Sequence, residues 1–420
     1  MHRLLIIAAI TACYFAFAIL LNSVGTVILQ SIGSFNISKP EASVLEGFKD
    51  LPIAFVSFFI ASFIPRMGYK IALIIGLVLS LIGCILVPAV PAFWSIKILF
   101  ALVGSAFALV KISVYSIVGM LTKSTNEHSA LLNTIEGIFM LGVLAGYWYF
   151  AYFIDAQNSA SLSWLNAYWG LAVLLLGTIL LVFISPISTP NKKNDGDSQV
   201  SDDFIAMLKL AYKPMVLVFI ISIFMYVLVE QGIGTWLPTF NNEVLALPAD
   251  ISVQLTSVFA LALALGRLGA GQVLRFLSWF PFMLTCLLGM AALILVSLPL
   301  ADKIDTANIN SVIQLPFIAF LFPLIGAFMA PIYPVLNSVV LSSLPTQNQS
   351  AMTGLIVVFS ALGGTSGSLI TGTLFELIGG QQAFYMLLLP IVGITTALIF
   401  LKRWSAHSDV SSSADVEANS

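Results

Sequence analysis

The sequence has few charged residues for its length. Asp, Glu, Lys and Arg make up 9% of the 420 residues, whereas 59% are hydrophobic. Soluble domains carry about 25% charged residues, so a chain with so few charges could not cover a water-exposed surface of this size. We therefore expect the lipid bilayer to be its main solvent. The net charge of −2 gives no indication of nucleic-acid binding.

Cysteine and histidine are also scarce. Cys13, Cys84 and Cys286 fall in separate apolar runs, which predicts buried thiols without a disulfide framework. The three histidines lie at or beyond the edges of the apolar runs, and the sequence has no His-Glu-x-x-His, Gly-x-Ser-x-Gly or phosphate-binding Gly-Lys-Ser/Thr motif. We expect neither an enzyme nor an ATP-driven pump, and no cofactor or metal.

Long apolar runs dominate the chain, and each is long enough for a transmembrane helix of about 20 residues. The first run continues to about Gln30, beyond the core of about 7–15 residues of a signal peptide, so we interpret it as an uncleaved span. The predicted spans are 4–30, 44–64, 71–91, 95–121, 132–154, 164–186, 213–238, 250–274, 279–300, 312–343, 351–377 and 381–401.

A polar stretch from Ser188 to Asp203 divides these spans into six plus six. We expect an all-α membrane protein with a six-helix bundle at 1–187, a cytoplasmic linker at 188–208 and a second bundle at 209–404. Residues 405–420, rich in Ser and Asp, predict a disordered cytoplasmic tail.

Basic residues predict the orientation, because cytoplasmic loops carry more Lys and Arg than outer loops. With the N-terminus inside, the outer flanks hold only Lys39, Lys97 and Lys303. The inner flanks hold Arg3, Arg66, Lys70, Lys123, Lys192, Lys193, Lys209, Lys213, Arg275, Lys402 and Arg403. Both termini and the central linker are therefore expected in the cytoplasm.

Charged residues within the spans follow a period of three. The third, sixth, ninth and twelfth spans have none, which predicts lipid contact. The others can enclose a polar path. Their interior charges are Glu46, Lys49, Asp50, Lys111, Glu136, Glu230, Arg267 and Glu376.

This organisation resembles the major facilitator superfamily. The segment from Pro65 to Lys70 resembles its basic loop between helices 2 and 3, and Gly266 to Gly271 repeats the pattern in the second half. Asn22–Gln30, Gly68–Leu77 and Glu230–Pro238 further resemble the fucose permease-like sugar:proton symporters. That group carries an aspartate and a glutamate where this chain has Gly25 and Lys111.

The resemblance implies two pseudo-symmetric six-helix halves in the bacterial inner membrane. It implies a monomer that takes up a sugar with a proton or a sodium ion by alternating access. Arg66 and Arg267 would be gating residues, with Arg267 at a contact between helices.

Candidate substrate-binding residues lie on the helices expected to line the path. Lys111 is about 15 Å deep at 1.5 Å per residue, with Tyr115 one turn on, and pairs with either a substrate carboxylate or an internal acid. A hydrogen-bonding set with one indole would suit a sugar. It comprises Asn22, Gln30, Asn133, Glu230, Gln231, Trp236, Tyr333 and Asn337.

Asp50 and Glu136 are the candidate proton or ion carriers. Glu46 lies four residues before Asp50 and shares its face, and Lys49 has the spacing to pair with Glu46. Two alternatives stay open within the fold. Lys111 would be the counter-charge of an anionic solute such as a sugar acid, or the protein would export drugs, which the polar path disfavours. A paired Lys111 would leave little charge for an anion.

Overall fold

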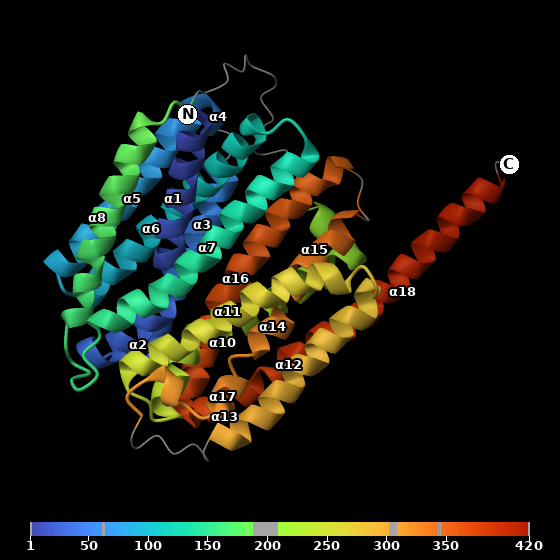
Figure 1. The fold of residues 1–420 in the computed structure, drawn as a ribbon. Coiled ribbons are helices and arrows are strands. Elements are labelled where there is room, and N and C mark those ends of the chain that lie inside the picture. Colours follow the sequence, from blue (N-terminus) through green and yellow to red (C-terminus); the bar gives the residue numbers. More distant parts are fainter. Residues whose placement is uncertain are drawn as a thin grey trace.

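The structure is a computed structural model that describes residues 2–60, 64–187, 209–301, 309–342, 344 and 346–418. The described part is a bundle of long helices (Figure 1). The expected linker at 188–208 falls wholly outside the described residues, as does Lys303.

The first half of the bundle is built from the chain up to Ile187. Its helices are α1 (His2–Asn22), α2 (Val24–Phe35), α3 (Lys39–Ile60), α4 (Ile64–Met67), α5 (Tyr69–Ala89), α6 (Phe93–Leu121), α7 (Thr125–Phe153), the 3-10 turn η1 (Ser163–Asn166) and α8 (Ala167–Ile184).

The second half follows the same plan. Its helices are α10 (Pro214–Glu243), α11 (Ala249–Val273), α12 (Trp279–Ala301), η2 (Val312–Gln314), α13 (Phe317–Leu321), α14 (Ile325–Met329), α15 (Ile332–Ser342), α16 (Thr346–Ile378), α17 (Gly380–Met386) and α18 (Leu388–Ala418).

Within the described residues, eleven helical stretches are long and apolar enough to cross a membrane. The twelfth span is α3, which has the length but carries Glu46, Lys49 and Asp50 in its interior. The twelve predicted spans are therefore confirmed as helical segments.

Two of the predicted spans are broken. The first divides into α1 and α2 at Ser23, whose hydroxyl donates to the Leu20 carbonyl oxygen (2.7 Å). The tenth divides into α13, α14 and α15 because Pro323 and Pro331 have no backbone N–H to continue a helix. We predicted a single helix in each case.

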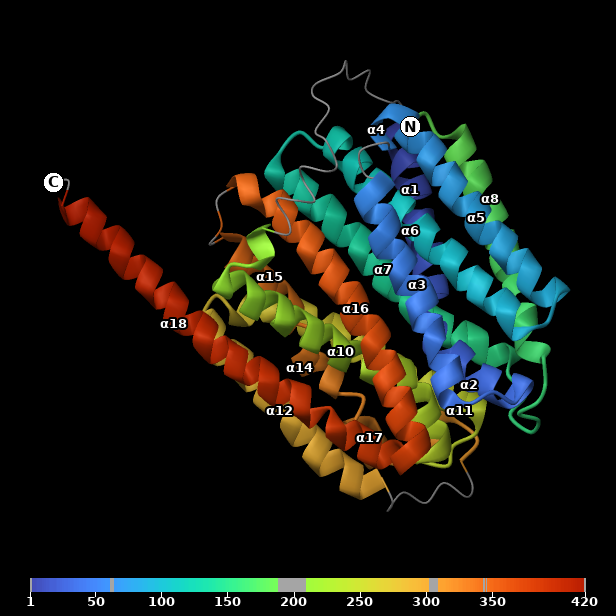
Figure 2. The ribbon, with the colours of Figure 1, turned by 180° about the vertical axis from the view of Figure 1, so that it is seen from behind.

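The last helix also extends further than expected. We expected a disordered tail at 405–420, whereas α18 continues as helix to Ala418 and projects from the bundle (Figures 1 and 2). The sequence after Arg403 has no Gly or Pro that would end a helix.

The third, sixth, ninth and twelfth spans, α5, α8, α12 and α18, present exposed apolar side chains, as the charge period predicts. Examples are Ile82, Val173, Leu295 and Val392. The three cysteines are buried, as predicted.

The helices alternate in direction, so the bundle has two ends. The near end is the end of the bundle where α1 begins and α6 ends. The far end is the end where α6 begins and α10 ends.

At the near end, Lys70 donates to the carbonyl oxygens of Phe183 (2.7 Å) and Ser185 (2.8 Å), which connects the basic loop at Pro65–Lys70 to the last turn of α8. Gly68 precedes α5 with a φ of 99°, a conformation that favours glycine.

Among the described residues, three helix pairs make the most extensive contacts between the two halves. These are α3 with α16, α7 with α11, and α2 with α10. Figure 2 shows α3 and α16 side by side. The charged helix α3 is thus covered by the opposite half, which buries Glu46, Lys49 and Asp50.

Candidate functional site

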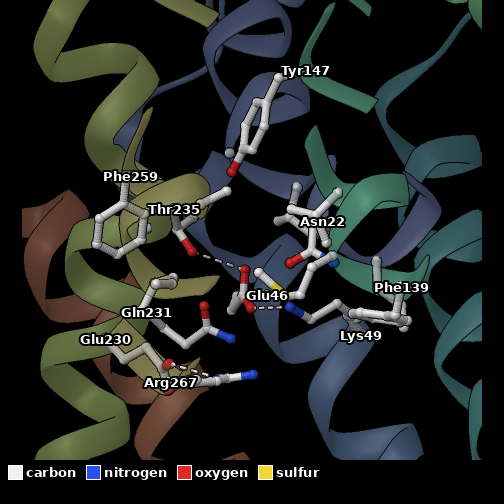
Figure 3. Close-up of a pocket in the computed structure, with 18 residues that line it drawn as sticks. Asn22, Glu46, Lys49, Phe139, Tyr147, Glu230, Gln231, Thr235, Phe259 and Arg267 are labelled. Atoms are coloured by element: carbon white, nitrogen blue, oxygen red, sulfur yellow. Dashed lines mark hydrogen bonds and ion pairs between the residues drawn. The ribbon is translucent and has the colours of Figure 1, made fainter. Parts of the chain in front are cut away.

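A cavity of about 200 Å³ lies between the two halves. The break between α1 and α2 supplies Asn22, α3 supplies Glu46 and Lys49, and α7 supplies Phe139 and Tyr147. From the second half, α10 and α11 supply Glu230, Gln231, Thr235, Phe259 and Arg267 (Figure 3). The lining is mixed, with three aromatic rings among charged, amide and hydroxyl groups.

Each half contributes one ion pair to the cavity wall. The Lys49 ammonium contacts Glu46 Oε1 in a buried pair, as its spacing predicts. Arg267 Nη2 lies 4.0 Å from Glu230 Oε1, with the Arg267 side chain about half exposed. Each of these carboxylates therefore has a cation beside it, and the four charges cancel.

Glu46 also joins the two halves. Its Oε2 accepts a hydrogen bond from the Thr235 hydroxyl at 3.1 Å (Figure 3). Sequence reasoning did not select Thr235 or Tyr147. From the sequence, Glu46 and Lys49 are interpreted as a local pair only. The contact of Glu46 with Thr235 is missed because the two residues are 189 positions apart in the sequence.

Further contacts between the halves lie towards the far end. Lys39 Nζ lies 3.2 Å from Glu243 Oε1 and 3.7 Å from Glu376 Oε2. The Ser368 hydroxyl donates to the Ser43 carbonyl oxygen (3.2 Å). Trp148 Nε1 donates to Ser257 Oγ (3.2 Å), which connects α7 with α11.

Polar residues nearer the near end are more exposed. Lys111, Tyr115 and Asn133 are exposed, and Glu136 is half-buried. A Cβ at Gly137 would have no neighbour within 4 Å, so α7 faces open space there. The cavity is therefore closed towards the far end and reached from the near end.

Lys111 has aromatic neighbours instead of an acid. Its Nζ lies 5.9 Å from the ring centroids of both Phe107 and Tyr115. Among the described residues, no carboxylate oxygen lies within 4 Å of it, and Glu136 instead accepts a hydrogen bond from the Tyr115 hydroxyl (2.9 Å). Within the described part of the chain, Lys111 thus forms no salt bridge, although Glu136 is close enough to interact with it electrostatically.

The remaining predicted residues lie outside the cavity lining. Trp236 is fully buried and donates from Nε1 to the Ser368 carbonyl oxygen (2.9 Å). Tyr333 shares a hydrogen bond with Ser360 (3.2 Å), and Asn337 Oδ1 is buried without a hydrogen-bond partner among the described residues.

Three predicted residues of the first half also lie outside the lining. Gln30 is buried in α2, Asp50 is buried beside Lys49, and Arg66 is exposed at the near end.

Gly25 explains one departure from the sugar symporters that the sequence resembles. A Cβ at this position would lie 2.6 Å from the Thr235 carbonyl oxygen. The close approach of α2 and α10 therefore leaves no room for the aspartate that those proteins carry there.

Comparisons with known proteins agree with this architecture. The sequence model of the Major Facilitator Superfamily matches residues 7–310. No curated protein matches the chain in sequence. Many solved structures are similar in fold, among them the following three. The nucleoside transporter NupG has a TM-score of 0.69 at 14% identity, with 96% of this chain and 99% of that chain covered.

The other two structures are symporters by their descriptions. A variant of the Escherichia coli fucose:proton symporter FucP has a TM-score of 0.59 at 16% identity, with 96% of this chain and 99% of that chain covered. A D-xylose–proton symporter has a TM-score of 0.64 at 13% identity, with 95% and 96% covered. At these identities the likeness concerns the fold.

Proposed function

The chain belongs to the Major Facilitator Superfamily and is a multi-pass membrane transporter, and on that premise we propose that it carries a neutral sugar together with a proton. The observation that supports a neutral solute is the charge balance of the cavity. Among the lining residues, Glu46 is paired with Lys49 and Glu230 with Arg267, so the lining itself offers neither an anion nor a cation a net opposite charge.

The other lining groups suit a polyhydroxylated molecule. Asn22, Gln231 and Thr235 offer donors and acceptors to hydroxyl groups. Phe139 and Phe259 offer aromatic faces against which the C–H side of a sugar ring can pack. The fold similarity to fucose and xylose symporters supports the same substrate class.

Alternating access would expose this cavity to each side of the membrane in turn. We propose that the near end is cytoplasmic, because most of the basic flanking residues lie there. The contacts of Lys39, Ser43 and Trp148 then close the outer side. The conformation described here would be the inward-open one.

A second candidate substrate is a sugar acid or another organic anion. The observation that favours it is Lys111, which forms no salt bridge within 4 Å among the described residues and contacts the Phe107 and Tyr115 rings. Lys111 would attract a carboxylate, although it does not line the cavity itself. The proposed proton coupling would remain the same in this case.

Uptake into reconstituted vesicles separates the two substrates. Neutral sugars and sugar acids are tested under proton and sodium gradients, with the wild type, Lys111→Met and Lys97→Met. Lys97 is a matched control, since it lies on the same helix over the Phe93 ring (4.5 Å) but near the far end.

We expect proton-driven uptake of neutral sugars that survives in both variants. Uptake restricted to acids and lost only in Lys111→Met would overturn the neutral-sugar proposal in favour of the anion. Uptake that follows the sodium gradient would refute the proton as the coupling ion.

A further inference from the structure

Three charged side chains of α3 form a buried group at the contact between the halves. Lys49 contacts Glu46 and lies 3.5 Å from Asp50 Oδ1. The three residues are between 0% and 9% exposed. Two carboxylates therefore share one ammonium group, which leaves one negative charge without a counter-charge when all three are ionised.

Among the described residues, no cation other than Lys49 lies within 4 Å of the Glu46 or Asp50 carboxylate oxygens. From α10, Thr235 donates a neutral hydrogen bond to Glu46, and Glu230 is itself an acid paired with Arg267. From α7, Tyr147 lines the same cavity as a neutral phenol. The three histidines of the sequence, at positions 2, 128 and 407, are remote from this segment of α3. An uncompensated carboxylate that is removed from water destabilises the state that buries it.

The group is shielded from the far side only while the two halves are in contact. Asp50 packs so closely on α16 that a Cβ at Gly364 would lie 2.3 Å from Asp50 Oδ2. Glu46 is covered by Thr235 of α10. If α3 separates from α10 and α16 when the far end opens, water reaches both carboxylates. In the conformation described here, Glu46 and Lys49 line the cavity and connect Asp50 with it.

We propose that Glu46 and Asp50 together bind the transported proton, with Lys49 neutralising the second carboxylate; this assignment rests on the proposed function. A proton from the far side adds to a carboxylate oxygen, and the group becomes neutral, which permits the halves to close over it. From the closed state the proton passes to water in the cavity. The restored negative charge then favours reopening of the far end, so that the empty transporter returns to the conformation that binds the next proton.

The geometry favours this pair over Glu136, the other acid that the sequence suggests as a carrier. Glu136 accepts a hydrogen bond from Tyr115 within the same half. It lies on the open near side and makes none of the contacts that close the far end. A proton on Glu136 would therefore have little influence on the contact between the halves.

Transport by conservative variants tests the assignment. In vesicles, we expect Asp50→Asn to retain counterflow exchange of the sugar and to lose accumulation driven by a proton gradient. Glu136→Gln should retain both activities. Proton-driven accumulation by Asp50→Asn, or its loss in Glu136→Gln alone, would overturn the proposal.

A conformational measurement tests the same idea without a substrate. Spin labels at Gln157→Cys and Ile313→Cys report the far end, because both positions are exposed in far-end loops of opposite halves. The native cysteines are buried and should label little. In the wild type, lowering the pH should increase the population with a short distance between the two labels, which is the population with a closed far end. In Asp50→Asn, this population should stay high at every pH.

The two measurements separate failure of this inference from failure of the proposed function. A wild type that moves no sugar but shows the pH-dependent distance, lost in Asp50→Asn, would refute the sugar and support the proton site. Proton-coupled sugar uptake with a distance distribution that is independent of pH, or equally pH-dependent in Asp50→Asn, would keep the function and refute the site.

Discussion

Gln231 is an amide that faces the cavity between an ion pair and a hydroxyl group. It follows Glu230 in the chain and lies one turn before Thr235 on α10. An amide can donate and accept at the same time, which suits the hydroxyl groups of a sugar. A substitution of Gln231 therefore measures how much one uncharged hydrogen bond contributes to substrate binding.

We expect Gln231→Ala to raise the apparent KM for the sugar. The loss of one neutral hydrogen bond is worth about 0.5–1.5 kcal/mol, which corresponds to a factor of roughly 2 to 12. The maximal rate should change little, because the ion pairs and the contacts between the halves remain. Gln272→Ala is the matched control, since Gln272 is an exposed amide on α11 outside the cavity. An unchanged KM in Gln231→Ala would remove this residue from the substrate site.

Residue type and depth in the membrane predicted some of the cavity residues but not their partners. Glu230 and Gln231 were expected and line the cavity. Trp236 was expected beside them, yet its indole points into the second half and packs 5.6 Å from the Phe375 ring centroid. Helical spacing alone does not tell which side of a polar helix faces its own half and which faces the opposite one.

At the scale of elements, α3 is the helix that most strongly connects the two halves. Near its centre it carries the charged group of Glu46, Lys49 and Asp50, and at its first residue it carries Lys39. Lys39 meets Glu243 at the end of α10 and Glu376 near the end of α16. Its ammonium also lies 5.5 Å from the Phe375 ring centroid. Opening of the far end must break these contacts.

Lys39→Ala should therefore shift the transporter towards the conformation with an open far end. Exposed ion pairs contribute about 0.2–1 kcal/mol each, so two pairs predict a change in the closed-to-open ratio of roughly 2-fold to 30-fold. The distance between labels at positions 157 and 313 measures this ratio. Lys97→Ala is the control, because Lys97 lies at the same end and contacts Phe93 of its own half. An equal shift in both variants would point to a general charge effect.

A hydropathy pattern does not predict where a membrane-spanning helix breaks. Residues 312–343 are continuously apolar enough for one span, but their prolines divide them into short helices. The break at Ser23 has no proline. It occurs beside Asn22, where α1 ends at the cavity. Membrane helices tolerate such breaks where other groups satisfy the freed backbone atoms.

For the whole molecule, the placement of charge predicted the architecture well because it follows from the solvent. The third, sixth, ninth and twelfth spans lack interior charge, and each of them presents exposed apolar side chains. The contacts that close the far end could not be predicted in the same way. They join residues such as Ser43 and Ser368, which are 325 positions apart, and depend on how two separately folded halves meet.

The orientation of the whole molecule decides what the closed far end means for transport. If basic flanks are cytoplasmic, the near end faces the cytoplasm, and the conformation described here releases its solute inwards. Single cysteines at Gln157, in a far-end loop, and at Phe276, an exposed near-end residue, test this directly. We expect a membrane-impermeant maleimide to label position 157 in intact cells and position 276 only after permeabilisation, with the cysteines otherwise buried as a low background. The reverse pattern would place the closed end inside, and the same cavity would then be open to the exterior.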